Sequence, residues 1–523
     1  MNMKLTGTAS AFAMFVGACG MGMHGAAEAQ ASNQELKQQV DLLREQMDIL
    51  RSQLEKVTKQ LAETPLAAAP VQASGAHEFI ERKPGGGVTF LTRGGEVSVY
   101  GNLDISADAA TKGIGGMTAA GEPMTPPGRN GWLTDISTNL SYVGVRGFQS
   151  LGGFPAMFVY QLETQIDVSA TSGTSGSNSN TSNVVKGGFT SRNSFIGLSS
   201  PSWGAFKIGK TDAPYKQSTA SMNPFSGMWG DYSVIMGNSG GDNRVEFGTR
   251  LDHAAWYESP VWSGFNFNIL VSPGQNRATD SSNLAAGESD CAGGNVPGSG
   301  GTAVACNDGA FGTAYSLSAS YRSGPFLLTG AYELHRDVNR TSDLPAFDPT
   351  DVADESAAKI GAQLRFGTGT TVSAVYERLR RHVPDALAFQ NERSRSGYWL
   401  SLSQDVGSID SLHFGWAHAN KTPGDPGVHN TAGGANPDNA ANMFTLAWKR
   451  QIDKQFSYYA NYATTVNHHD AHYDLGAGGR AVTTDCHDAA NPDGSGFDPN
   501  GGGGHCWAGG RLQGVSVGMK YAF

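Results

Sequence analysis

The sequence lacks long apolar runs beyond its first residues and has few charged side chains for its length. Only 16% of its 523 residues are Asp, Glu, Lys or Arg, whereas 70 are glycine. No apolar run past the N-terminus approaches the about 20 residues that a membrane-spanning helix needs. If the chain lies in a membrane, closed β-structure is the remaining architecture, because lipid cannot pair free backbone groups.

Positive charge is also scarce. The 37 Lys and Arg residues face 47 Asp and Glu residues, which gives a formal net charge of −10. No basic stripe of the kind that phosphate contacts need is present, so a nucleic-acid partner is excluded. The segment His468–Asp474 has metal-ligand residue types but no evident closed set of four. We expect a solvated loop there, with adventitious binding of a divalent ion as the alternative, and we expect no cofactor.

Cysteine is rare, with five in the chain. Cys19 falls near the N-terminus, and the others form two close pairs, Cys291 with Cys306 and Cys486 with Cys506. Four cysteines allow three connectivities, and local pairing is favoured because each partner is nearby and no C-x-x-C metal spacing exists. Four free loop thiols are the alternative. Disulfides would imply an oxidising compartment.

Residues 1–29 have the pattern of a secretory signal peptide. Lys4 supplies the positive start, AFAMFVGACGMGM the apolar region, and Ala27-Glu28-Ala29 the small-x-small cleavage site. The segment Val16–Cys19 loosely resembles a lipoprotein signal, which leaves lipidation of Cys19 as the alternative. Cleavage after Ala29 is favoured because its site is the better match.

Residues 32–62 predict a coiled coil. Apolar residues follow one another at alternating spacings of four and three, which is a heptad seam. Leu42 and Ile49 widen the apolar face, which favours three helices over two. An amphipathic helix lying on another protein is the alternative. The apolar seam of residues 32–62 consists of Leu36, Val40, Leu43, Met47, Leu50, Leu54, Val57 and Leu61.

The next residues, 63–95, are rich in Ala, Pro and Gly and predict a linker.

From residue 96 to 523 the hydrophobic period becomes two. Apolar faces alternate with polar ones, and eight long connections alternate with short turns, which predicts an all-β transmembrane barrel of about 16 antiparallel strands. Alternation predicts inward charges at Arg146, Lys207, Lys359, Arg365, Lys449, Lys520, Asp104, Glu163, Glu333 and Glu377. Candidates for the aromatic girdle are Trp416, Trp448, Tyr458 and Tyr462.

One long connection, residues 213–249, is rich in glycine and also carries Phe225, Trp229 and Tyr232. Burial of this many aromatic side chains is favoured over their exposure to water. We therefore expect this segment to fold back into the lumen of the barrel, where it narrows the pore.

Six segments resemble the Gram-negative general porin family of trimeric 16-stranded barrels. They are VSVYGNLDISAD, SYVGVRGFQSLGG, YQLETQ, SRNSFIGLSSPSWGAFKIGKTD, WYESPVWSGF and GVSVGMKYAF, in order from residue 96 to 523. The resemblance implies a homotrimer in the bacterial outer membrane, in contact with lipid and lipopolysaccharide. It implies passive diffusion of small hydrophilic solutes and ions, and no catalysis. The coiled coil departs from the ordinary family pattern; we expect it in the periplasm, where it joins three chains or reaches peptidoglycan.

The resemblance also implies a constriction between acids on the inward loop and a row of basic residues on the wall. At one basic position of the family pattern this chain has a tyrosine, which leaves the row with one charge fewer. Strict alternation from Ile208 would point the next basic candidate at lipid, so we predict a bulge or bend at Gly209. The implied constriction residues are Lys210, Arg250, Arg146, Tyr142, Asp231 and Asp242.

Three other functions remain open. Some dicarboxylate-type porins carry a coiled-coil extension, which suggests a carboxylate- or anion-selective channel. A structural tether, with the barrel as its anchor, would have a plugged lumen. A barrel hydrolase would use Ser239 in the segment Gly237–Gly241, but no histidine base is placed beside it by the pattern, so glycine-rich turns are favoured.

Overall fold

The computed structural model describes most of the region from residue 87 to the C-terminus. The described residues are 87–111, 131–166, 168–169, 192–237, 247–273, 312–339, 352–382, 394–421, 438, 440–468, 471, 473, 475–476 and 510–523. The predicted signal peptide and coiled coil, the four cysteines that were predicted to pair, Ser239 and Asp242 lie outside them. Among the described residues, none of the helices is long and apolar enough to cross a membrane.

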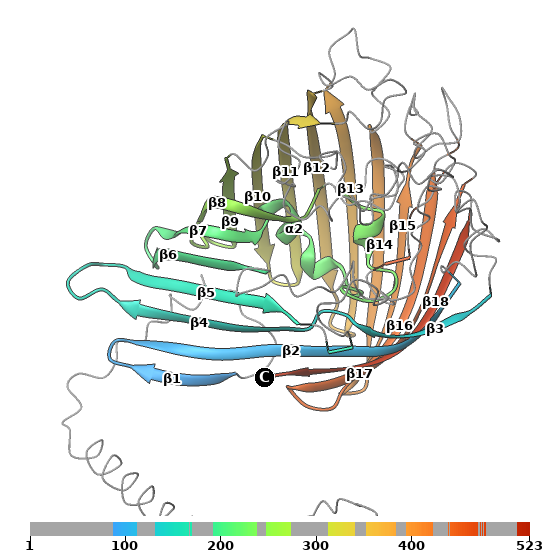
Figure 1. Cartoon of the computed structure of the whole chain (residues 1–523), viewed down its shortest axis with the longest axis horizontal. Coiled ribbons are helices and arrows are strands. Elements are labelled where there is room, and N and C mark those ends of the chain that lie inside the picture. The colour runs from blue at the N-terminus through green and yellow to red at the C-terminus, as the bar shows by residue number, and fades with distance from the viewer. Residues whose placement is uncertain are drawn as a thin grey trace, which may run out of the picture. The chain divides into compact units, whose positions relative to one another are not determined.

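The described residues form eighteen strand segments in one antiparallel sheet (Figure 1). They are β1 (Val88–Thr92), β2 (Gly95–Ala110), β3 (Leu133–Thr138), β4 (Tyr142–Ser150), β5 (Met157–Gln165), β6 (Ser194–Ser200), β7 (Gly204–Asp212), β8 (Arg250–Glu258), β9 (Phe265–Ser272), β10 (Thr313–Ser323), β11 (Phe326–Asn339), β12 (Val352–Arg365), β13 (Thr370–His382), β14 (Arg395–Val406), β15 (Asp410–Ala419), β16 (Ala441–Gln451), β17 (Phe456–Asn467) and β18 (Arg511–Ala522).

Two pairs of segments each act as one strand, so the sheet closes as a barrel of sixteen. β3 and β4 pair in succession with the two halves of β2. β18 pairs with the other edge of β2 up to Asn102, and β1 continues along that edge from Val99 to Gly95. Closure joins the two ends of the sheet, as a barrel in lipid requires.

β1 corrects the predicted domain boundary. Residues 63–95 were expected to be a linker, but Val88–Thr92 form a strand that pairs with β2. The segment VTFLT is rich in β-branched and aromatic residues, which favour strands. The glycines that precede it masked this signal, so the barrel begins at Val88 and not at Glu96.

The predicted two faces are confirmed. The carboxylate residues predicted to face inward, Asp104, Glu163, Glu333 and Glu377, are at most 1% exposed. Apolar residues at the positions predicted to face outward are far more exposed: Ile360, Leu446 and Val517 each exceed 50%. Because neighbouring residues of a strand point to opposite sides, the exposed apolar set lies outside the barrel and the charged set inside.

The strand connections also follow the prediction. Short turns join the strands at one end, as between β12 and β13, whereas long connections join them at the other, as between β13 and β14. We call these the turn end and the loop end. Transmembrane barrels commonly have short turns at one end and long loops at the other.

Candidate functional site

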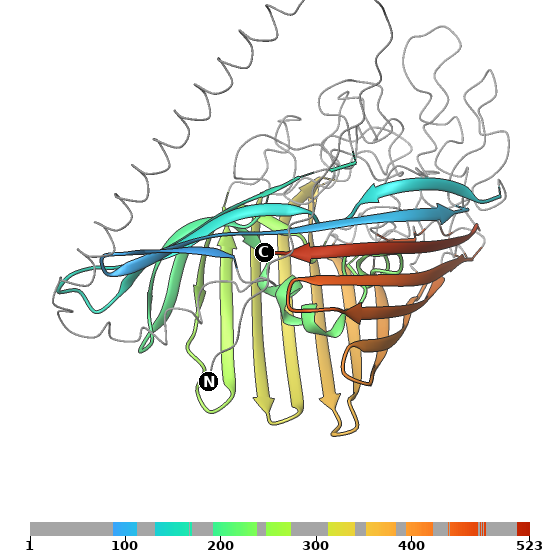
Figure 2. The same ribbon diagram turned by 90° about the horizontal axis from the view of Figure 1, so that it is seen from below.

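The connection between β7 and β8 lies inside the barrel (Figure 2). We call residues 213–249 the inward loop; the structure describes 213–237 and 247–249 of it. It contains the helix α2 (Pro214–Ser218) and two short 3-10 helices, η3 (Ala220–Met222) and η4 (Tyr232–Val234). The prediction that this segment folds back into the lumen is confirmed by its contacts with the inner wall.

The aromatic side chains of the inward loop explain why it is not in water. The ring of Tyr232 stacks on Trp399 at 5.3 Å between centroids, and Phe225 meets Trp399 edge-on at 6.0 Å. Trp399 on β14 is fully buried, whereas the next residue, Leu400, is 46% exposed on the outside. The loop therefore packs against the inner face of the wall, and this buried cluster also contains Met222.

Polar side chains of the wall bind the backbone of the inward loop along its length. The donors lie on β12, β14, β16 and β17. The amide of Tyr215 also donates to Ser316 Oγ on β10 at 2.9 Å, so the loop is attached from β10 to β17. The carbonyl of Met222 accepts from Trp399 Nε1 at 2.9 Å, and the carbonyl of Trp229 accepts from Asn461 Nδ2 at 2.8 Å. Further donors to the loop are Gln363, Ser401, Thr445 and Lys449.

Glu377 on β13 joins the two limbs of the inward loop. Its Oε2 accepts from the hydroxyl of Tyr215 at 2.6 Å, and its Oε1 accepts from the amide of Gly237 at 2.8 Å. The guanidinium of Arg395 lies 3.8 Å from the same carboxylate. Burial, and to a smaller extent the negative charge of Glu377, raise the pKa of the Tyr215 phenol well above its ordinary value. Tyr215 therefore stays a neutral hydrogen-bond donor.

The predicted irregularity near Gly209 is confirmed. The register of β7 against β8 shifts between Gly209 and Thr211, and Gly209 has φ +146°. The extra residue lies on β8, where His253 has φ +47°. Lys210 binds Asp252 at 2.8 Å in a pair that is 25% and 35% exposed.

Arg250 belongs to a separate charge cluster at the base of the inward loop. Its Nη2 lies 3.0 Å from Asp212 Oδ1, and its Nε donates to Asn193 Oδ1 at 2.7 Å. Lys216 of α2 binds the same Asp212 at 2.8 Å. Lys210 and Arg250 thus bind different aspartates, and the structure does not join them in one row.

Arg146 and Tyr142 lie together on the lumen face of β4. The guanidinium of Arg146 lies 4.5 Å from the ring centroid of Tyr100. That of Arg192 lies 4.7 Å above the ring of Tyr142 and binds Glu163. Arg192 was missed in the sequence. It places a positive charge beside the tyrosine that replaces a base of the family pattern, and its only sequence signal is its place just before β6.

The carboxylate of Asp231 is used within the inward loop itself. Its Oδ2 accepts from the amide of Gly227 at 3.0 Å, and its Oδ1 accepts from Asn223 Nδ2 at 2.8 Å and from the amide of Ser233 at 3.1 Å. Asp231 is buried and caps η4. The structure therefore gives it a folding role in the loop; its predicted role at the constriction stays a prediction.

His468 lies at the loop end, where its Nδ1 is 3.1 Å from Asp438 Oδ1. A hydrogen bond from Lys421, and a weaker effect of the one from His468, lower the pKa of the Asp438 carboxyl group. The neighbouring His469, Asp470 and His472 lie outside the described residues. In the part of the chain that the structure describes, no group of three or more His, Cys, Asp or Glu residues could hold a metal ion.

An antiparallel barrel of sixteen strands, apolar outside and charged within, defines a transmembrane β-barrel protein. A sequence model described as Gram-negative porin matches residues 62–470. The chain therefore belongs to the Gram-negative porin family, and its barrel lies in the outer membrane.

One sequence relative agrees with this membership. An outer membrane porin protein of Bordetella pertussis is 33% identical over 133 residues, which are 25% of this chain and 30% of that protein. The match thus spans less than a third of the relative.

Two solved structures share the fold. An anion-selective porin from Comamonas acidovorans has a TM-score of 0.53 at 16% identity, with 82% of this chain and 100% of that chain covered. OmpF of Salmonella typhi, solved with daunomycin, has a TM-score of 0.51 at 14% identity, with 83% and 100% covered.

Proposed function

We propose that the chain forms a channel for passive diffusion of small hydrophilic solutes and ions across the outer membrane. The observation that carries this proposal is the attachment of the inward loop to the inner wall from β10 to β17. A segment held inside an aqueous barrel narrows the path without closing the tube at either end. Pore width and the charges at that narrow section then select solutes.

A preference for small anions, including carboxylates, is the finer proposal. It is supported by Arg146 and Arg192, which lie over tyrosine rings on the lumen side. A guanidinium is always charged and binds carboxylates through paired hydrogen bonds. The solved anion-selective porin shares the fold. Glu163 is the acid that binds Arg192. The acid Asp242, expected from the resemblance, lies outside the described residues.

The proposed assembly is a homotrimer in contact with outer-membrane lipid and lipopolysaccharide. Its support is the heptad seam of residues 32–62, whose wide apolar face favours three helices. In the periplasm this segment would join the three chains or reach peptidoglycan. Deletion of residues 32–62 tests the first role. We expect native mass spectrometry to show fewer trimers after mild heating, with unchanged conductance per pore; equal trimer survival would contradict it.

Planar-bilayer recording of the purified full-length protein tests the channel. We expect stepwise insertion of conducting units, and a reversal potential in a salt gradient that reports anion preference. A sample unfolded by heat is the matched control. Folded protein that inserts into the bilayer without conductance steps would overturn the channel and favour a tether. Conductance with a cation-selective reversal potential would overturn only the anion preference.

A further inference from the structure

A second segment of the chain packs inside the barrel beside the inward loop. It belongs to the long connection between β17 and β18, of which the structure describes residues 468, 471, 473, 475, 476 and 510. We call Ala471, Tyr473, Leu475 and Gly476 the strap. The side chains of Ala471, Tyr473 and Leu475 are fully buried, although the connection starts at the loop end of the barrel. The strap therefore packs on other parts of the protein and does not extend into water.

Asn467, at the end of β17, turns the chain back toward the lumen. Its Nδ2 donates to the carbonyl of Tyr473 at 2.9 Å, and its Oδ1 accepts from the amide of Tyr473 at 2.8 Å. One side chain thus binds both backbone groups of a residue six positions further along the chain. Asn467 is buried and lies at an even spacing from Asn461, which binds the inward loop, so both face the lumen.

The far end of the strap pairs with the backbone of the inward loop. The amide of Gly230 donates to the carbonyl of Leu475 at 2.8 Å, and Trp229 and Gly476 form an isolated antiparallel bridge. Gly476 has φ +129°, and a Cβ there would lie 2.6 Å from the amide nitrogen of Gly230. The two segments approach each other as closely as neighbouring strands of a sheet do, so the position of one depends on the other.

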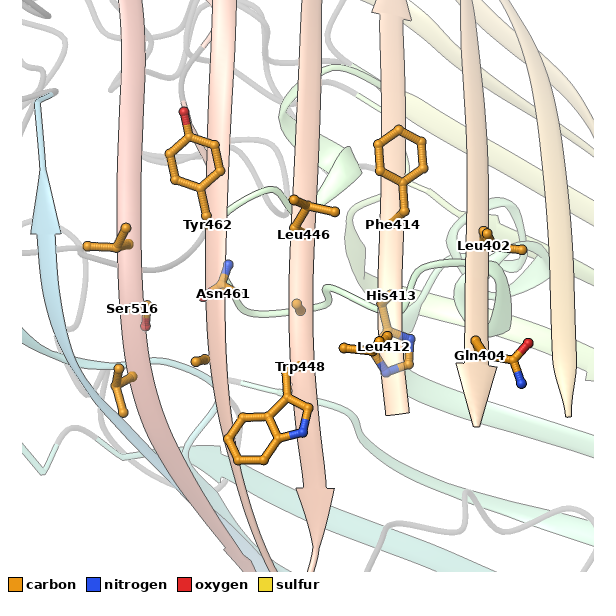
Figure 3. A pocket seen from close by; sticks show the side chains of 14 residues that line it. Leu402, Gln404, Leu412, His413, Phe414, Leu446, Trp448, Asn461, Tyr462 and Ser516 are labelled. Carbon is orange, nitrogen blue, oxygen red and sulfur yellow. The ribbon is translucent and has the colours of Figure 1, made fainter. Parts of the chain in front are cut away.

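The strap lies against the lumen side of the wall from β14 to β18. The Cζ atom of Arg395 on β14 is 5.8 Å from the ring centroid of Tyr473. Leu475 belongs to a buried apolar cluster with Ala463 of β17 and Leu512 of β18. On the outer side of these strands lies an apolar groove of about 680 Å³ (Figure 3), lined among others by Leu402, Phe414, Leu446 and Tyr462. This part of the wall is therefore apolar toward lipid and covered by the strap toward the lumen.

We propose that the strap is a second pore-narrowing segment, which fixes the inward loop and fills the lumen beside β14 to β18, and that Asn467 is the residue that positions it. The inward loop and the strap together cover the wall from β10 to β18. Solutes then pass along the remaining wall, which includes Arg146 on β4 and Arg192 next to Glu163 of β5. This inference rests on the proposed function, because a narrowing matters only where solutes pass.

The first experiment locates the strap without reference to conductance. Tyr473→p-azidophenylalanine places a photoreactive group on a ring that packs in one buried cluster with Tyr232 and Ile235 of the inward loop. Irradiation of the full-length protein, followed by peptide mass spectrometry, is expected to link residue 473 to the inward loop or to β14. The matched control Tyr315→p-azidophenylalanine, exposed on β10, is expected to give neither link. Absence of both links from residue 473 would contradict the placement of the strap.

The second experiment measures the effect of the strap on the pore by single-channel recording. Asn467→Ala removes both hydrogen bonds to Tyr473, so the time spent in a state of larger conductance is expected to rise at least about tenfold. Gly476→Ala, whose Cβ would collide with the amide of Gly230, is expected to act in the same direction. The matched control Asn268→Ala truncates a lumen-side asparagine of β9 that makes no side-chain hydrogen bond among the described residues, and should conduct as wild type.

The two experiments separate this inference from the channel itself. Wild-type protein that forms the links from residue 473 but does not conduct refutes the proposed channel, and the pore-narrowing role with it, while the position of the strap stands. A conducting protein in which folded Asn467→Ala and Gly476→Ala both keep wild-type conductance refutes the strap alone. Lower stability of Asn467→Ala with unchanged conductance would likewise overturn its positioning role, because a purely structural residue would give that result.

Discussion

The hydroxyl of Tyr215 donates a 2.6 Å hydrogen bond to Glu377, although 162 residues separate them in the chain. The same carboxylate accepts from the amide of Gly237 at 2.8 Å. Tyr215 opens the inward loop in α2, and Gly237 lies past its middle, so one side chain of β13 holds two distant parts of the loop. The path left for solutes therefore depends on this wall residue as well as on the loop.

Tyr215→Phe removes one hydrogen bond to a buried carboxylate. We expect it to lower the free energy of unfolding by about 1.5–3 kcal/mol, because the acceptor is charged. Urea unfolding in lipid vesicles measures this. The matched control is Tyr315→Phe, whose exposed side chain makes no hydrogen bond among the described residues; it is expected within about 0.5 kcal/mol of wild type. Tyr215→Phe and Glu377→Gln should be non-additive when combined; full additivity would contradict the contact.

Gly230→Ala should displace the inward loop. Gly230 has φ +77°, and a Cβ there would lie 1.9 Å from Thr445 Oγ1 on β16. Gly131 has the same φ with nothing within 4 Å, so Gly131→Ala is the matched control for backbone strain alone. We expect about 1–2 kcal/mol of destabilisation from strain in both variants and a further 1–3 kcal/mol from collision in Gly230→Ala.

The same pair of variants also tests where the loop lies. A loop displaced from the wall changes the width of the narrow section, so Gly230→Ala is expected to alter single-channel conductance while Gly131→Ala leaves it at the wild-type value. Identical conductance and stability in the two variants would refute contact between the loop and β16.

Arg146→Ala should shift selectivity toward cations. The side chain lies on the lumen face, where one unit charge acting over roughly 10 Å of water is worth about 0.4 kcal/mol, or about twofold in the permeability ratio. Reversal potentials in a salt gradient measure the shift. Arg450→Ala removes the same charge from the outer face, where it binds Asp410, and is expected to leave the ratio unchanged. A shift in both variants would indicate a general surface effect.

Asp453 makes the stability of the β16–β17 turn depend on pH. The amides of Phe456 and Gln455 donate to its carboxylate and lower its pKa below the ordinary value of 3.8. A carboxyl group with a lower pKa in the folded state stabilises that state above its unfolded pKa, and this stabilisation is lost as pH falls through the folded pKa. We expect Asp453→Asn to be less stable than wild type at pH 6, with the difference shrinking below pH 3.8. A difference that is constant with pH would contradict this.

Alternation in the sequence was sufficient to place the wall residues. Ile360 and Val517 lie outside and Lys359 and Glu377 inside, as predicted, because lipid and water select opposite faces of every strand. The conflict at Lys210 also predicted an irregularity near Gly209, since strict alternation would have placed a charge in lipid. The strand Val88–Thr92 was missed because flanking glycines read as a linker.

The sequence by itself determined the membrane barrel, its two faces and the segment that folds inward, because these follow from local period and composition. Only the tertiary structure decided what each charged group binds. Asp231 caps a turn of its own loop, Arg192 lies over Tyr142, and Glu377 accepts from Tyr215. Barrel closure and loop packing bring together residues far apart in the chain, and no local pattern records which of them will meet.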